Sequence, residues 1–204
     1  MSLAGAAERA DDEARERRKF LWRAVAAVGA LGSALSAWPF IASLSPSARA
    51  RALGGPVALD LSGLEVGQMS TFVWRSKPIF VLRRTPAMLS LLGEHDTQLK
   101  DPHSLDSEQP AYARNDWRSR EADLFVTVGI CTHLGCLPKA RLQAGEPPLG
   151  PTWPGGFFCP CHGSRFDLAG RVFDGSPAPV NLVIPPYAFS SRNTLVVGVD
   201  SVKK

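Results

Sequence analysis

The chain has 204 residues, which is long enough for one folded domain with an appendage. Its 23 Lys and Arg residues against 19 Asp and Glu residues give a formal net charge of +4, a mildly basic balance. No basic tract is interleaved with aromatic residues, so the sequence argues against a nucleic-acid-binding protein.

Residues 1–19 are polar and charged and show no apolar periodicity, which predicts a disordered or frayed helical tail. Within this tail, residues 17–21 read R-R-K-F-L and are followed by an apolar segment. This order resembles a twin-arginine export signal. Because twin-arginine export carries folded proteins, the signal indicates a domain that folds before it crosses the membrane.

Residues 24–44 contain no charged side chain. At about 1.5 Å per residue, a helix of this length reaches roughly 30 Å, the thickness of a bilayer core. The sequence therefore predicts a transmembrane helix over residues 20–44. A cleavable signal peptide stays open as the alternative, because an A-x-A-like sequence occurs at residues 48–50.

Basic residues flank this segment unequally. Five lie just before residue 24, at Arg15, Arg17, Arg18, Lys19 and Arg23, and two lie after it, at Arg49 and Arg51. The positive-inside rule then places the cytoplasmic tail 1–19 on the inner side and residues 45–204 outside. We expect a single-pass protein of the cell inner membrane with a periplasmic domain.

Residues 45–56 have the composition of a linker, in which Gly54 and Gly55 free the backbone and Pro56 blocks a helix. From residue 57 onward the pattern becomes β. Strands are predicted at 57–61, 69–74, 79–84, 124–128, 157–158, 188–190 and 195–199, with a hairpin at 166–173. The predicted fold class is mainly β, a small antiparallel β domain over residues 57–204 preceded by the single N-terminal helix.

One short helix is predicted to begin at Thr85, an N-cap residue followed by Pro86, and to close at Gly93. The stretch after it is polar and irregular. Because no cysteine or matched histidine accompanies His95 and His103, we expect both to be solvated loop histidines.

Two short motifs carry the chemistry: C-T-H-L-G-C at residues 131–136 and C-P-C-H-G-S at residues 159–164. They contain all four cysteines of the chain and two of its four histidines. Several soft and borderline ligands that converge from two loops indicate a metal centre. The spacing alone leaves open structural zinc and also two plain disulfides with incidental histidines.

The pair of motifs resembles the Rieske iron–sulfur protein family, in which two cysteines hold one iron of a [2Fe–2S] cluster and two histidines hold the other. The resemblance implies four ligands of one cluster and a disulfide that ties the loops together. These are Cys131 and Cys159, His133 and His162, and the disulfide pair Cys136 and Cys161. Such a disulfide needs an oxidising compartment, which agrees with the predicted periplasmic placement.

Further positions match that family. Ser164 matches a serine whose hydroxyl bonds a bridging sulfide, and residues 175–179 match a proline-rich loop that covers the cluster. Phe166 stands where many high-potential members have tyrosine, so we expect a somewhat lower reduction potential here. Leu134 is expected to be an exposed apolar residue at the tip of the first loop, and residues 45–56 a hinge.

The resemblance covers nearly the whole chain and is to the Rieske subunits of bacterial cytochrome bc complexes, which are quinol-oxidising oxidoreductases. It implies that ubiquinol, held by a cytochrome b subunit, meets His162 as the catalytic residue and passes it a proton and the cluster an electron. The head then swings to a c-type cytochrome within a dimeric complex. Alternatives are a ring-dioxygenase ferredoxin, a small Rieske subunit of another periplasmic oxidoreductase such as arsenite oxidase, and a zinc module of the cell envelope.

Overall fold

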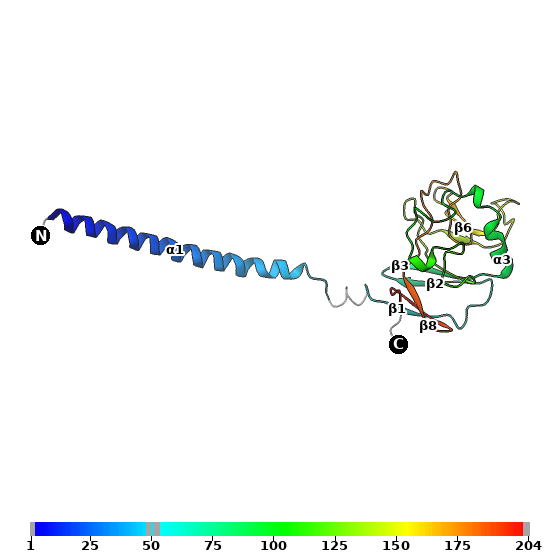
Figure 1. The fold of residues 1–204 in the computed structure, drawn as a ribbon, viewed down its shortest axis with the longest axis horizontal. Helices are drawn as coiled ribbons and strands as arrows, with labels where there is room; N and C mark the ends of the chain where they lie inside the picture. Colours follow the sequence, from blue (N-terminus) through cyan, green and yellow to red (C-terminus); the bar gives the residue numbers. More distant parts are fainter. Residues whose placement is uncertain (1–2, 48–49, 51–53, 202–204) are drawn as a thin grey trace. The chain divides into compact units, whose positions relative to one another are not determined.

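The computed structural model describes residues 3–47, 50 and 54–201 (Figure 1). The chain forms two compact units, Met1–Arg51 and Ala52–Lys204. Residues 48–49 and 51–53, which belong to the predicted hinge and to the A-x-A-like sequence, lie outside the described residues.

The first unit is one helix, α1 (Leu3–Ser43). The tail is therefore helical from Leu3, which matches the helical one of the two alternatives that the sequence left open. Alanine, glutamate and arginine favour a helix, and an ion pair of 2.8 Å joins Lys19 to Glu16 one turn earlier. Local propensity thus extends the apolar helix into the charged segment.

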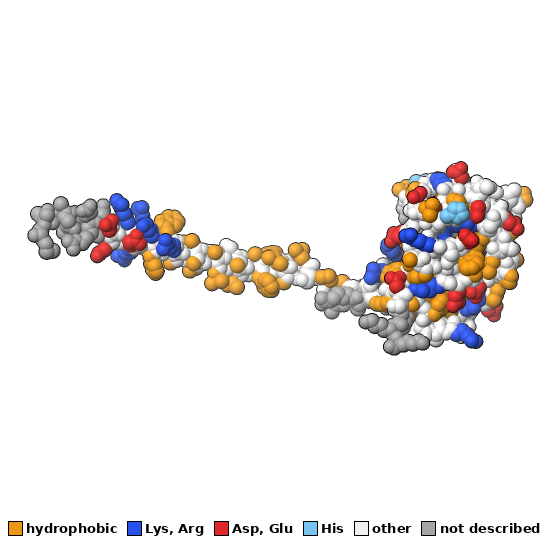
Figure 2. Space-filling view, in the orientation of Figure 1, with side chains coloured by type: hydrophobic (Ala, Val, Ile, Leu, Met, Phe, Trp, Pro, Cys, Tyr) orange, Lys and Arg blue, Asp and Glu red, His pale blue; other side chains and the backbone are white. Residues whose placement is uncertain are grey.

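The apolar half of α1 is long and apolar enough to cross a membrane, by length and composition. Figure 2 shows its hydrophobic side chains following a charged stretch that carries both signs. The large apolar side chains are all exposed, from Phe20 to Ile41. This half of the helix is apolar on every side, and no other described element of its own unit covers it. Such a surface is suited to contact with lipid or with a partner helix.

The second unit is mainly β, as predicted, and contains three antiparallel three-stranded sheets. The first orders β1 (Val57–Asp60), β9 (Thr194–Val197) and β8 (Tyr187–Ser191). The second orders β2 (Met69–Trp74), β3 (Lys77–Arg83) and β4 (Leu124–Val128). The third orders β5 (Lys139–Arg141), β6 (Gly156–Phe158) and β7 (Arg165–Phe166).

The β2–β3 sheet separates β1, where the chain enters the domain, from β6, which leads into the second cysteine motif (Figure 1). Phe157 of β6 packs between this sheet's aromatic rings, with ring centroids 5.8 Å from Phe80 and 6.1 Å from Phe125. All three side chains are buried, so the small third sheet shares one core with the second. The strand that leads into the second cysteine motif is therefore anchored in the hydrophobic core.

The turn between β2 and β3 is tighter than the sequence suggests. Arg75 and Ser76 both have positive φ, of 50° and 59°, so two residues suffice and β3 begins at Lys77. Thr85 does cap α3 (Pro86–Ser90), accepting a bond from the Met88 amide, and a 3-10 turn η1 (Leu91–Gly93) ends the helix where predicted. Two more such turns, η2 (Asp96–Gln98) and η3 (Ala111–Ala113), lie in the polar stretch.

The predicted hairpin at 166–173 is present as a single bridge between Phe166 and Val172 around a turn at Gly170, where φ is 69°. Its residues lie in the core, and buried arginines bind its backbone. Arg84 donates to the carbonyl of Leu168, and Arg118 donates to the carbonyls of Ala169 and Gly170. Burial lowers the pKa of each of these two arginines to about 10, so both stay charged at neutral pH.

The expectation that His95 is solvated is wrong, whereas His103 is exposed as predicted. His95 is 6% exposed, and its Nε2 lies 3.3 Å from a carboxylate oxygen of Asp167, which is fully buried. Asp167 also binds Arg171 Nε at 2.7 Å. The partner lies 72 residues away along the chain, so no local pattern could indicate this pairing.

Candidate metal centre

Both cysteine motifs form the same kind of closed loop. In the first, the amide of Cys131 donates to the carbonyl of Cys136 at 2.8 Å, and the amide of Gly135 donates to the carbonyl of Cys131 at 3.0 Å. Gly135 has φ of 82°, a left-handed conformation that favours glycine. The loop therefore turns tightly and brings its first and last residues together.

The second loop repeats this construction. The amide of Cys159 donates to the carbonyl of Ser164 at 2.8 Å, and that of Gly163 donates to the carbonyl of Cys159 at 2.9 Å. Gly163 has φ of 80°, again in the left-handed region. The matched hydrogen bonds explain why the sequence places glycine just before the last residue of each motif.

The third sheet brings the loops side by side. Lys139, just beyond the first loop, pairs with Phe158, which directly precedes the second. Phe158 pairs in turn with Arg165 on the far side of the second loop. The short strand β5 thus positions the first motif beside the second.

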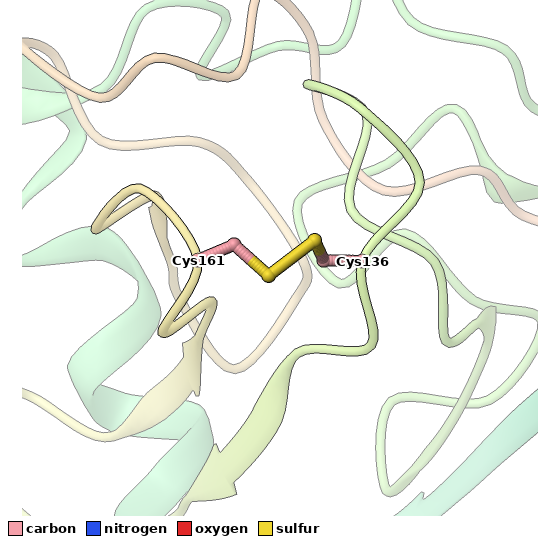
Figure 3. Close-up of a disulfide and its surroundings, with 2 residues drawn as sticks. All are labelled: Cys136 and Cys161. Atoms are coloured by element: carbon pink, nitrogen blue, oxygen red, sulfur yellow. A yellow bond between two sulfur atoms is a disulfide. The ribbon is translucent and has the colours of Figure 1, made fainter.

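A disulfide between Cys136 and Cys161 joins the two loops (Figure 3). Its Cα atoms are 6.7 Å apart, and the cysteines are 25 residues apart in sequence. In a chain-entropy account, a bridge of this span stabilises the fold by about 3 kcal/mol. This is the pairing that the family resemblance implied, and it leaves Cys131 and Cys159 as the free thiols.

The free thiols are both buried, each 2% exposed, and belong to the hydrophobic core. Burial, together with the neighbouring Cys131 sulfur, raises the pKa of Cys159. A buried thiol with a raised pKa is poorly suited to catalysis as a free nucleophile. It is well suited to a metal, because a bound cation displaces the thiol proton.

His133 and His162 lie against each other on the outer side, with ring centroids 4.8 Å apart and ring planes at 87°. His162 is exposed and His133 half-buried. The Nδ1 atom of His133 is buried and has no hydrogen-bond partner among the described residues. An orphaned imidazole nitrogen is costly to bury unless it is satisfied by something bound, which fits a metal ligand.

Ser164 is a second buried residue with an unused hydrogen-bonding group. Its hydroxyl oxygen is fully buried and accepts a bond from the Ala178 amide at 3.1 Å. No hydrogen bond among the described residues uses its hydroxyl hydrogen. The loop thus presents a buried donor beside Cys159, where an acceptor such as a sulfide fits.

The sulfur atoms of Cys136, Cys159 and Cys161 lie within 4.8 Å of one another. Two of these three form the disulfide and cannot act as thiolates, so the trio is not a ligand set. The donors that remain are two buried thiols and two neighbouring imidazoles. That donor set fits a [2Fe–2S] centre of mixed ligation, and by donor type alone it also fits zinc.

The loop at residues 175–179, together with the adjoining Val180, contacts both ligand loops, which are residues 131–136 and 159–164. Ala178 contacts Ser164 as described, and the hydroxyl of Thr132 in the first loop donates to the carbonyl of Val180 at 2.6 Å. Sequence reasoning missed Thr132, because its partner is 48 residues away. Leu134 is 71% exposed at the tip of the first loop, as predicted.

Two family models match this chain. Residues 7–47 match the one described as "Ubiquitinol-cytochrome C reductase Fe-S subunit TAT signal", and residues 102–188 match the one described as "Rieske [2Fe-2S] domain". The second match contains both cysteine loops and the loop at 175–179.

Curated relatives match over most of their length. The ubiquinol-cytochrome c reductase iron-sulfur subunit of Allochromatium vinosum is 50% identical over 184 residues, which is 90% of this chain and 89% of the relative. The protein of the same name from Rhodospirillum rubrum is 43% identical over 183 residues, 89% and 91% of the two chains. Among solved structures, a chain of a hyperthermophilic respiratory Complex III matches with a TM-score of 0.46 and 25% identity, covering 84% of this chain and 96% of that one. The family assignment rests on the sequence matches and not on this weaker structural similarity.

Proposed function

This chain belongs to the family of ubiquinol–cytochrome c reductase iron–sulfur subunits, and we propose that it is the electron-transfer subunit of a membrane-bound cytochrome bc complex. The activity of such a complex is an oxidoreductase reaction between ubiquinol and a c-type cytochrome. The observation that carries the proposal is the paired loops, which hold two buried thiols on one side and two adjacent imidazoles on the other.

In this proposal, Cys131 and Cys159 would hold one iron of a [2Fe–2S] cluster, and His133 and His162 would hold the other. When bound, such a cluster supplies a one-electron carrier, and its neutral ligands raise its potential. The buried hydroxyl of Ser164 would donate a hydrogen bond to a sulfide of the cluster. The Cys136–Cys161 disulfide keeps the two ligand loops together.

His162 is the residue that the proposal places in contact with substrate. Its ring is exposed, so the nitrogen that is not bound to iron can accept the hydrogen bond and the proton of a quinol hydroxyl. Leu134 and Leu137, which are 71% and 57% exposed, give the tip an apolar surface that suits docking to partner proteins. The chain's own part in the reaction is to position this tip and to move one proton.

The names of the relatives support the proposed partners, since they describe a subunit of a ubiquinol–cytochrome c reductase. We infer a cytochrome b subunit that binds ubiquinol and a c-type cytochrome that accepts the electron, in a dimeric complex. The apolar part of α1 anchors the chain in the inner membrane with the N-terminus in the cytoplasm and the cluster domain in the periplasm. Residues 45–56 act as the hinge between the anchor and the head.

The first prediction concerns those partners. When the full chain is purified from its own membranes in mild detergent, a b-type and a c-type cytochrome are expected to co-purify, with quinol-dependent cytochrome c reduction. Optical spectra and a reductase assay measure this. A chain that instead leaves the membrane with a soluble oxidoreductase and no b-type cytochrome would overturn the proposal in favour of a subunit like that of arsenite oxidase.

The second prediction concerns Phe166, which is fully buried in β7 and lacks the hydroxyl that many family members carry there. Phe166→Tyr is expected to raise the midpoint potential, because a hydroxyl that donates to a ligand cysteine stabilises the reduced, more negative cluster. Voltammetry measures the shift. Phe189→Tyr in β8, which belongs to another sheet, is the control and should leave the potential unchanged. An unchanged or lower potential in the Phe166 variant would disprove this explanation.

A further inference from the structure

Lys100 reaches the loop that lies beside the two ligand loops. Its ammonium Nζ donates to the carbonyl of Ser176 at 2.6 Å and to the carbonyl of Ala178 at 3.0 Å. These partners lie 76 and 78 residues further along the chain. The backbone of Lys100 is fixed too, because its amide donates to the carbonyl of Val172 at 3.0 Å.

The two carbonyls that Lys100 binds are the ones that precede prolines, Pro177 and Pro179. Proline has no amide hydrogen, so the 175–179 loop has few donors with which to form a regular turn. Ser176 and Ala178 are 6% and 0% exposed, and buried carbonyls need partners. An ammonium offers three donors and forms charge-assisted hydrogen bonds, which are stronger than neutral ones.

Ala178 connects Lys100 to the metal centre through a second hydrogen bond. Ala178, whose carbonyl binds Lys100, donates its own amide to the hydroxyl oxygen of Ser164. Because that oxygen accepts from Ala178, its hydroxyl hydrogen is directed elsewhere, and no described hydrogen bond uses it. The position of Ala178 therefore decides where the buried Ser164 donor points.

The charge of Lys100 also has no counterion in the part of the chain that the structure describes. Among the ion pairs of the described residues, none within 4.0 Å includes Lys100. Lys100 is an exposed residue, so its ammonium could stay in water, and holding it against two carbonyls costs rotamer freedom that the contacts must offset. Here the ammonium binds the loop carbonyls and remains a net positive charge next to the loop.

We propose that Lys100 is a positioning residue for the metal centre: it holds the 175–179 loop so that the Ala178 amide keeps the Ser164 hydroxyl aimed at the cluster. The inference rests on the proposed function, since it needs a cluster at the ligand loops. Its consequence is a higher reduction potential, because a fixed hydroxyl donor and a nearby positive charge both stabilise the more negative reduced state.

The test uses the full chain in detergent with Lys100→Met, Lys100→Arg and the control Lys139→Met. Lys139 is exposed on β5, just beyond the first ligand loop, and makes no described side-chain hydrogen bond to the 175–179 loop, so the control removes the same charge without the contact. Two quantities are measured: hydrogen exchange of the peptide that contains Ala178, by mass spectrometry, and midpoint potential, by voltammetry.

Lys100→Met is expected to speed exchange of the Ala178 amide about tenfold or more, as the loss of hydrogen bonds to a charged group implies, and to lower the midpoint potential. Lys100→Arg keeps the donors and the charge and should stay near wild type in both quantities. Lys139→Met should leave exchange unchanged. If Lys100→Met gives no folded chain, Lys100→Gln is measured instead, with the same expected directions.

Equal behaviour of the Lys100→Met and Lys139→Met chains would overturn the inference. A lowered potential with unchanged exchange would overturn it as well, because charge alone would then explain the shift. A wild-type chain without inorganic sulfide would refute the proposed function instead, whereas the exchange measurement would still report on the Lys100 contact. The two failures are therefore distinguishable.

Discussion

His162→Ala is expected to leave a folded chain that has lost its cluster. The His162 side chain is exposed and makes no hydrogen bond among the described residues, so its removal should cost the fold little. The same change removes one of two neighbouring imidazoles, which lie 4.8 Å apart. Mutating a residue that only hydrogen-bonds to a metal ligand typically lowers metal affinity roughly 10- to 100-fold. Removing a ligand itself should lower the affinity further.

Iron and inorganic sulfide per purified chain measure this loss, together with quinol-dependent reduction. His103→Ala is the matched control, because His103 is exposed but lies outside both ligand loops. The control should keep its full iron and sulfide content. Retention of both in the His162 variant would exclude His162 as a ligand.

Asp167→Ala is expected to destabilise the folded domain by about 3–5 kcal/mol, the cost of breaking a buried ion pair by removing one partner. The carboxylate accepts bonds from Arg171 Nε at 2.7 Å and from the amides of Ala169 and Arg171 at 2.9 and 2.7 Å. The side chains of Asp167 and Arg171 are 0% and 2% exposed. Without the carboxylate, the amides of Ala169 and Arg171 and the buried Nε of Arg171 lose their acceptor, and only the ion pair with Asp96 remains to balance the guanidinium charge.

Urea unfolding of the full chain in detergent, followed by tryptophan fluorescence, measures this destabilisation. Asp123→Ala is the control, because its ion pair with Arg83 is 3.9 Å long and half exposed, and it should cost no more than about 1 kcal/mol. If the two variants unfold at the same urea concentration, the buried pair contributes nothing beyond a surface one.

The Asp167 carboxylate also determines how the stability of the domain should change at acid pH. Burial would raise the pKa of Asp167, but the hydrogen bond from His95 and the charge of Arg171 outweigh it and hold the pKa below its usual value. Its stabilisation is therefore fully present above the unfolded pKa of about 3.9 and is lost as the pH falls through the lower folded pKa. The wild-type chain should lose more stability below that pH than Asp167→Ala does.

Local patterns were enough to predict much of the fold. The strand at 69–74 has the predicted bounds, and Thr85 caps its helix, because alternation and capping depend on neighbours in sequence. Strand β5 was missed, since Lys139–Arg141 has no strand signal of its own and exists only through pairing with β6. The turn at residues 75–78 was predicted, but two residues too long, because neither Arg75 nor Ser76 is a residue that usually takes positive φ.

The candidate site divides in the same way. Motif spacing and family resemblance predicted the ligand loops and the disulfide, and the structure adds what those patterns cannot contain. His95 with Asp167, Thr132 with Val180, and Lys100 with Ala178 are pairs far apart in sequence, so no local motif contains both partners of any pair. Burial of the arginines that bind the 166–173 hairpin was unexpected for the same reason, because charged residues are mostly exposed.

The most direct test of this account is the iron and acid-labile sulfide content of the full wild-type chain, purified anaerobically from its membranes. Two thiols and two imidazoles that share one [2Fe–2S] cluster require two irons and two sulfides per chain. That stoichiometry is the expected result. A chain that carries one zinc ion and no sulfide would contradict the account, because the same four side chains would then form a structural site with no electron to transfer.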